Sequence, residues 1–76
     1  MIFDKIKKLI CEKKSIKEDT IFLETRLKED LALDSFDAVE LVIELEKIFD
    51  LKISDEVMQQ FKIVKDIVSY VESNLS

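Results

Sequence analysis

The chain contains no glycine, proline, histidine or tryptophan, and it has a single cysteine. Glycine and proline normally form turns and end helices, so turns here must use residue types such as Asp, Ser, Asn, Lys and Thr. Without histidine, the usual acid–base group at neutral pH and any Ser-His or Cys-His nucleophile are missing. The sequence therefore does not indicate an enzyme.

Metal, disulfide and membrane functions are also disfavoured. Cys11 has no second cysteine for an internal disulfide, and one thiol without histidine is no zinc site. We interpret it as a passive, half-buried thiol, with a redox-reactive thiol as the alternative. No segment has the spacing of a calcium loop, so no dedicated metal site is predicted. No apolar run reaches the length of a signal-peptide core or a membrane span, so we expect no membrane insertion and a cytoplasmic location, or an organelle after processing.

Length and composition are typical of one small helical domain. The 76 residues are 47% hydrophobic and 38% charged, with a formal net charge of −5. This balance favours a compact soluble domain over a disordered chain. A chain of this length has room for one core only, so residues 1–76 are predicted to form a single domain with little surplus stability.

Hydrophobic periodicity predicts an all-α fold, a small antiparallel four-helix bundle with three longer helices and one short helix. A long loop should join the first two helices, held to them by aliphatic side chains that act as anchors. The predicted helices run from Ile2 to between Lys13 and Ser15, from about Ser35 to Phe49, from Ser54-Asp55-Glu56 to about Phe61, and from Val64 to Leu75, with Ser76 fraying. The loop anchors are Ile16, Ile21, Leu23, Leu27, Leu31 and Leu33.

The second predicted helix has more apolar residues than one buried face needs. Its clearest stripe, at helical spacing, should be core: Ala38, Leu41, Val42, Leu45, Ile48 and Phe49. Phe36, Val39 and Ile43 widen the apolar arc beyond this stripe. Such an excess indicates either deeper packing or a surface that contacts partners or lines a space for cargo.

Asp34 and Ser35 are suited to the start of this helix, because a short side-chain oxygen can accept from the free N–H groups of the first turn. A second acid, Asp37, follows three residues after Asp34. A hydroxyl at Ser35 would project at the positive end of the helix dipole, where an attached phosphate is favoured. Ser35 is therefore a candidate phosphoester site, although such a pair of residues is often only a helix cap.

The stretch from Leu33 to Glu56, LDSFDAVELVIELEKIFDLKISDE, resembles the acyl carrier protein family. The resemblance rests on the Asp-Ser-Leu-like motif at residues 34–36 and on the helix behind it, and weaker similarity covers most of the chain. It implies a carrier whose Ser35, next to Asp34, bears a 4′-phosphopantetheine arm that holds acyl groups on its thiol. A separate phosphopantetheinyl transferase adds the arm from coenzyme A.

The resemblance also implies a partner-binding surface for the transferase and for acyl-processing enzymes. The resemblance gives its acids as Asp37, Glu40 and Glu46. The apolar residues Phe36, Val39 and Ile43 are added to this surface because they widen the apolar arc of the same helix. The chain departs from the family pattern at four positions, where the family's usual glycine, leucine, proline and threonine are replaced by Ala32, Phe36, Ser54 and Ile63. Fatty acid biosynthesis is the expected pathway, and polyketide, peptide or other specialised acyl pathways remain open.

Charge is unevenly distributed along the chain. Residues 29–56 contain ten acids and two lysines, whereas residues 1–18 contain six lysines and three acids. Negative potential around Ser35 would steer basic docking surfaces toward it and repel nucleic-acid phosphates. The basic first helix leaves open a contact with nucleic acid or anionic lipid, but it has no arginine, so no nucleic-acid partner is predicted. We expect a monomer, and an unmodified acidic helical adaptor is the alternative to a carrier.

Overall fold

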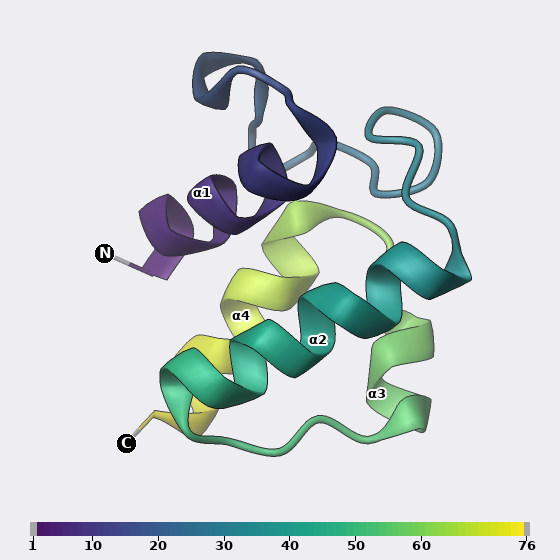
Figure 1. Cartoon of the computed structure of the whole chain (residues 1–76). Helices are drawn as coiled ribbons and strands as arrows, with labels where there is room; N and C mark the ends of the chain where they lie inside the picture. The colour runs from purple at the N-terminus through teal and green to yellow at the C-terminus, as the bar shows by residue number, and fades with distance from the viewer. Residues whose placement is uncertain (1, 76) are drawn as a thin grey trace.

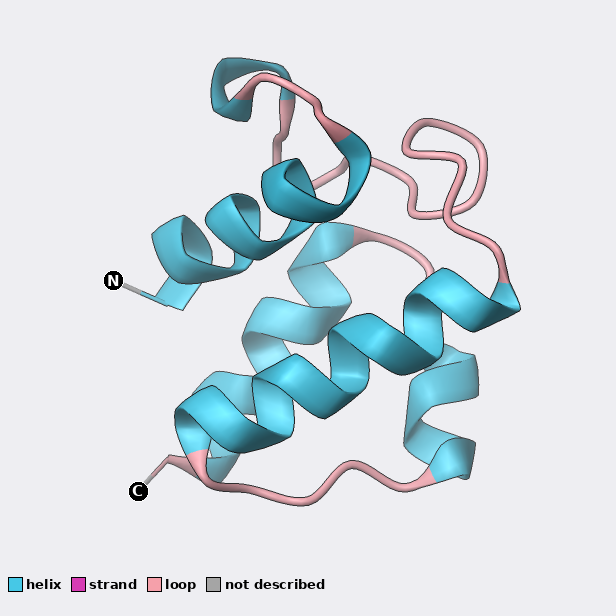
Figure 2. Ribbon diagram, in the orientation of Figure 1, coloured by secondary structure: helices cyan, strands magenta, loops and turns pink. Residues whose placement is uncertain are grey.

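The computed structural model describes residues 2–75 and is all-helical, as the periodicity predicted (Figures 1 and 2). Within these residues there is no β-strand, and one isolated antiparallel bridge joins Arg26 to Ile63. Helix α2 crosses in front of α4 in Figure 1, and the short α3 lies beside the start of α2. The elements are α1 (Ile2–Lys14), the 3-10 helix η1 (Glu18–Thr20), α2 (Ser35–Phe49), α3 (Asp55–Gln60) and α4 (Val64–Asn74).

The core lies between α1, α2 and α4 and is closed by the long loop between the first two helices. Ile6, Leu45 and Val71, one from each long helix, have no exposed surface. The loop anchors behave as expected, because Ile21, Leu27, Leu31 and Leu33 are buried and Ile16 and Leu23 pack against the core partly buried. Burial of these aliphatic side chains allows a loop of this length to be ordered.

Ile48, which was expected in the core, is exposed instead, and so is Leu75, the predicted last residue of the fourth helix. Ile48 keeps 45% of its surface exposed and Leu75 keeps 43%. At about 100° per residue, Ile48 lies roughly 60° from Leu45, the middle of the buried stripe, and Phe49 lies roughly 40° to the other side. In the last turn of α2, Phe49 therefore packs against the core in place of Ile48. Leu75 follows Asn74, the last residue of α4, so the helix no longer holds it against the bundle.

Within residues 2–75, three non-glycine residues have the left-handed backbone conformation that glycine normally adopts. Ser15, Ala32 and Asp50 have φ values of 54°, 54° and 51°. Ser15 and Asp50 follow the ends of α1 and α2, and they belong to the residue types predicted for turns. Ala32 was not predicted there, because its Cβ makes this conformation costly. Its neighbours Leu31 and Leu33 are both buried, so the reversal at Ala32 lets two consecutive anchors reach the core.

Backbone hydrogen bonds fasten the long loop to the start of α4. The Leu27 N–H donates to the Lys62 carbonyl at 3.0 Å, and the Val64 N–H donates to the Thr25 carbonyl at 3.0 Å. Thr25 is buried, and its hydroxyl accepts from the Phe22 N–H at 2.7 Å. Residues separated by more than thirty positions along the chain are therefore held side by side.

Candidate functional site

Ser35 is the first residue of α2, as predicted, and its side chain is exposed. Asp34 caps the helix: its Oδ1 accepts from the Asp37 N–H at 2.8 Å, and the Asp37 Oδ2 accepts from the Asp34 N–H at 3.4 Å. This reciprocal pair satisfies two of the donors at the start of the helix. The N–H groups of Ser35 and Phe36 remain directed out of the helix end, beside the Ser35 hydroxyl.

Asp37 is also paired with a residue of α1. The Lys14 Nζ lies 2.9 Å from the Asp37 Oδ2, and both side chains are about three-quarters buried, with 25% and 23% exposure. The hydrogen bond from Lys14 lowers the pKa of the Asp37 carboxyl below its usual value, and the bond from the Asp34 N–H acts in the same direction. This contact fixes the start of α2 against the end of α1. The hydrophobic periodicity of the sequence did not predict this ion pair.

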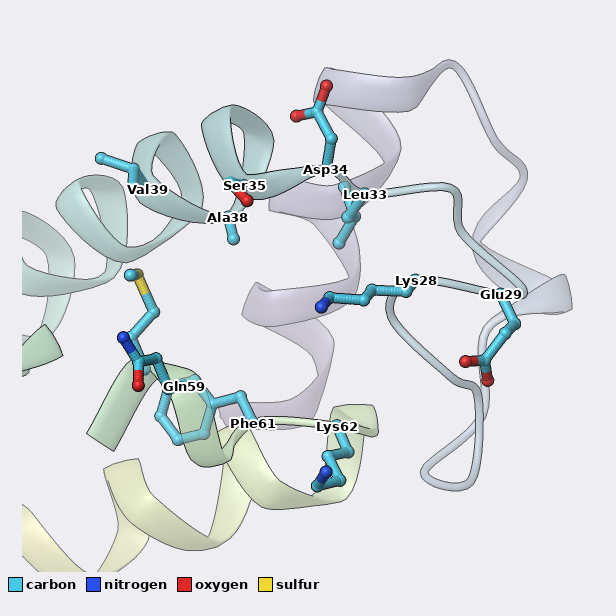
Figure 3. A pocket seen from close by; sticks show the side chains of 11 residues that line it. Lys28, Glu29, Leu33, Asp34, Ser35, Ala38, Val39, Gln59, Phe61 and Lys62 are labelled. Carbon is cyan, nitrogen blue, oxygen red and sulfur yellow. The ribbon is translucent and has the colours of Figure 1, made fainter. Parts of the chain in front are cut away.

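A cavity of about 590 Å³ opens beside Ser35, between α2, α3 and the long loop (Figure 3). Its apolar wall comes from Leu33, Ala38, Val39, Met58 and Phe61. Its polar rim consists of Lys28, Glu29, Asp34, Ser35, Gln59 and Lys62. The cavity therefore combines a hydroxyl, an apolar wall and two lysines in one space.

Lys28, Met58, Gln59 and Lys62 were not singled out from the sequence. The hydrophobic residues of the loop that contains Lys28 follow no sustained period, and α3 is too short to show a helical one. The isolated bridge between Arg26 and Ile63 brings both lysine-bearing segments to the cavity. A pairing between two such distant positions leaves no local signal in the sequence.

The apolar residues predicted to face partners lie on the exposed side of α2. Phe36, Val39 and Ile43 are 73%, 42% and 44% exposed, on the side of α2 opposite Leu45. Packing in the core, one of the two interpretations of these residues, is therefore wrong. Their contact with partners stays a prediction.

The three acids predicted for the partner surface differ in their surroundings. Glu40 is exposed on α2. Glu46 is partly buried, and its Oε2 accepts from the Ile53 N–H at 2.9 Å, which braces the loop after α2. Asp37 is held by Lys14. Glu40 is thus the acid of this set that is most open to a partner.

The cysteine and the remaining carboxylates of residues 2–75 give no second candidate site. Burial raises the pKa of the Cys11 thiol, and Glu18 acts in the same direction, so less of the thiol is in the reactive thiolate form. Residues 2–75 bring together no group of three or more potential metal-ligating side chains. None of the helices described is both long and apolar enough to cross a bilayer.

A four-helix fold with an exposed serine at the start of its second helix, beside a partly apolar cavity, is compatible with a small helical carrier domain. The sequence comparisons agree with this class. The family model described as "Acyl-carrier" matches residues 1–76. The chain belongs to the acyl carrier family.

Individual relatives support this membership over nearly the whole chain. The acyl carrier protein of Aster yellows witches'-broom phytoplasma is 57% identical over 76 residues, which is 100% of both chains. That of Campylobacter lari is 42% identical over 72 residues, covering 95% of this chain and 94% of the relative. The solved acyl carrier protein from Enterococcus faecalis has a TM-score of 0.84 and 34% identity, with 96% of this chain and 92% of that chain covered. Acyl carrier proteins are carriers and not enzymes, so this chain is a non-catalytic carrier.

Proposed function

We propose that the Ser35 hydroxyl bears a 4′-phosphopantetheine arm and that the protein presents acyl groups on this arm to the enzymes of fatty acid biosynthesis. The observation that carries the proposal is the position of Ser35, exposed on the first residue of α2 at the mouth of the cavity. When bound, the arm supplies a terminal thiol that holds acyl groups as thioesters.

The residues around Ser35 fit a phosphodiester-linked arm. The Ser35 and Phe36 N–H groups are not used by the capping pair, so they can donate to phosphate oxygens at the positive end of the helix dipole. The charge of Asp37, which would oppose a second anion, is balanced by Lys14 at 2.9 Å. These features offset the repulsion that a phosphate would meet among the acids of α2.

The cavity also fits a flexible, partly apolar arm and the first part of an acyl chain. Leu33, Ala38 and Phe61 form part of its apolar wall, below the Ser35 hydroxyl (Figure 3). Each methylene buried against such a wall contributes about 0.8 kcal/mol. A cargo sheltered here would be partly protected from water until a partner enzyme draws it out.

The exposed side of α2 supports a role in docking. Phe36, Val39 and Ile43 give an apolar strip, and the open carboxylate of Glu40 lies on the same helix. An apolar centre with acids nearby suits basic enzyme surfaces, whose approach is accelerated by opposite charge. We therefore assign this side to the phosphopantetheinyl transferase and to acyl-processing enzymes. Residues 1–76 would act as one monomeric carrier domain in the cytoplasm.

Intact-mass measurement tests the attachment site. Protein incubated with a phosphopantetheinyl transferase, coenzyme A and magnesium should gain the mass of one phosphopantetheine, and Ser35→Ala should gain none. Ser69→Ala removes another exposed helical serine and serves as the matched control, with a full gain expected. No gain in the unmodified sequence would favour the adaptor alternative, and a gain that persists in Ser35→Ala would place the arm elsewhere.

Identification of the cargo tests the pathway. Protein recovered from its native cells should release a saturated or partly reduced fatty acyl group when its thioester is cleaved. A polyketide, an aminoacyl group or another specialised acyl group would instead assign the carrier to one of the alternative pathways.

A further inference from the structure

We infer that Lys28, together with Lys62, forms a cationic rim that binds the phosphodiester of the arm and holds its first part over the cavity. This inference rests on the proposed attachment at Ser35. Neither lysine belongs to the motif at residues 34–36 or to α2. The predicted contact joins the phosphodiester to Lys28 in the loop before α2.

The first observation is the direction of the Lys28 side chain. It extends from the loop into the cavity, toward the side on which Ser35 and Phe61 lie, whereas the neighbouring Glu29 carboxylate points away (Figure 3). An anion attached to the Ser35 hydroxyl would therefore meet the Lys28 ammonium group in the cavity, with the Glu29 carboxylate directed away from it.

The second observation is that Glu29 and Asp30, the two acids directly after Lys28, are already paired. The Arg26 guanidinium lies 3.4 Å from the Glu29 carboxylate and 3.1 Å from the Asp30 carboxylate, and the Asp30 Oδ2 also accepts from the Arg26 N–H at 2.9 Å. Lys28, between these residues, takes part in none of the ion pairs found within residues 2–75. Its charge is therefore available to a ligand.

The third observation is that the fold places a second lysine at the same rim. The Leu27 N–H donates to the Lys62 carbonyl at 3.0 Å, so Lys28 and Lys62 are attached to adjoining backbone segments. The backbone near Lys28 is held further by the 3.0 Å bond from the Leu33 N–H to the Leu27 carbonyl. In Figure 3 the Lys62 ammonium group is directed away from Ser35, so Lys62 acts on the phosphodiester through its charge at the rim and Lys28 makes the direct contact.

The phosphodiester is the anion that fits this arrangement. Its oxygens would lie within bonding distance of the Ser35 hydroxyl position, at the helix end where Asp34 adds negative charge. A nearby ammonium group compensates that charge and forms charge-assisted hydrogen bonds with phosphate oxygens. Because both lysines are exposed, the contact should be weakened by salt.

Phosphorus NMR of the loaded protein tests the contact. The phosphodiester resonance should move between low and high sodium chloride in the unmodified protein, and Lys28→Gln should lose this movement. Lys28→Arg should retain it, and Lys62→Gln should reduce it. Lys47→Gln, at the far end of α2, removes the same charge outside the cavity and should behave as the unmodified protein. A Lys28→Gln resonance as salt-dependent as that of the unmodified protein would overturn the inference.

A second measurement needs no variant. Loading with the arm should shift the side-chain Cε resonance of Lys28 and leave that of Lys47 in place, whereas equal Lys28 resonances in the bare and loaded proteins would contradict the contact. Intact-mass measurement distinguishes failure of the proposed function from failure of this inference. Absence of loading in the unmodified protein defeats the proposed function, while full loading without any response from Lys28 defeats only the cationic rim.

Discussion

Replacing Ala32 by glycine should stabilise the protein. Ala32 has φ of 54°, in the left-handed region where a Cβ collides with the backbone, at a cost of roughly 1–2 kcal/mol. Glycine relieves this cost but makes the unfolded chain more flexible, which opposes the gain by about 0.4–1 kcal/mol. The net stabilisation should be about 0.5–1 kcal/mol.

The surrounding contacts explain why the alanine stays in this conformation. The Leu31 N–H donates to the Arg26 carbonyl at 3.2 Å, and the Leu33 N–H donates to the Leu27 carbonyl at 3.0 Å. Leu31 and Leu33 are both 4% exposed. Relaxing φ at Ala32 would withdraw at least one leucine from the core, at a greater cost than the strain itself. The strain should therefore be present in the folded protein, where glycine can remove it.

The only other alanine, Ala38, provides a matched control. Ala38 lies inside α2, where the same change to glycine should destabilise by about 1 kcal/mol. Urea unfolding, fitted for both the midpoint and the slope, should separate the two variants by about 1.5–2 kcal/mol with opposite signs. In a domain of this size, Ala32→Gly should raise the melting temperature by about 2–8 °C. Destabilisation by Ala32→Gly of the size seen for Ala38→Gly would refute the assignment of strain.

Two further predictions concern the ion pair and the core. Since the folded-state pKa of Asp37 is lowered, its ionised form contributes stability that is present above about pH 4 and is lost as pH falls through the lowered value. Asp37→Asn should therefore lower the melting temperature at pH 7 and converge with the unmodified protein near pH 2; an equal difference at both pH values would exclude the pairing with Lys14. Leu45→Ala should destabilise by about 2–5 kcal/mol, and Ile48→Ala by about 0.5 kcal/mol or less, in chemical unfolding. Equal losses of stability in the two variants would mean that Ile48 is packed in the core, as Leu45 is.

Local patterns were sufficient for α2 and its neighbours. Asp34, followed by Asp37, marked the start of α2, and the apolar stripe continued to Phe49, so both ends were predicted correctly. Ser54 likewise marked the start of α3, where its hydroxyl accepts from the Val57 N–H at 3.2 Å. These signals are readable because cap and helix interactions join residues three or four positions apart.

Contacts between distant residues could not be predicted in this way. Lys14 and Asp37 are 23 positions apart, and Arg26 and Ile63 meet only because the loop folds back on the start of α4. Ala32 was missed for a related reason. Its left-handed conformation is imposed by the burial of Leu31 and Leu33 on either side, against alanine's own preference.

These internal contacts also distinguish the three acids of α2 that were predicted to face partners. Asp37 is held by Lys14 and by the capping pair, and Glu46 is bonded to the Ile53 N–H, so a basic partner residue would have to displace an existing interaction to use either carboxylate. Glu40 takes part in none of the ion pairs found within residues 2–75 and is exposed. Removing Asp37 or Glu46 would therefore weaken the fold as well as docking, whereas removing Glu40 would affect docking alone. If α2 docks as proposed, we expect the apolar strip of Phe36, Val39 and Ile43 to supply most of the contact area and Glu40 to contribute an unpaired negative charge.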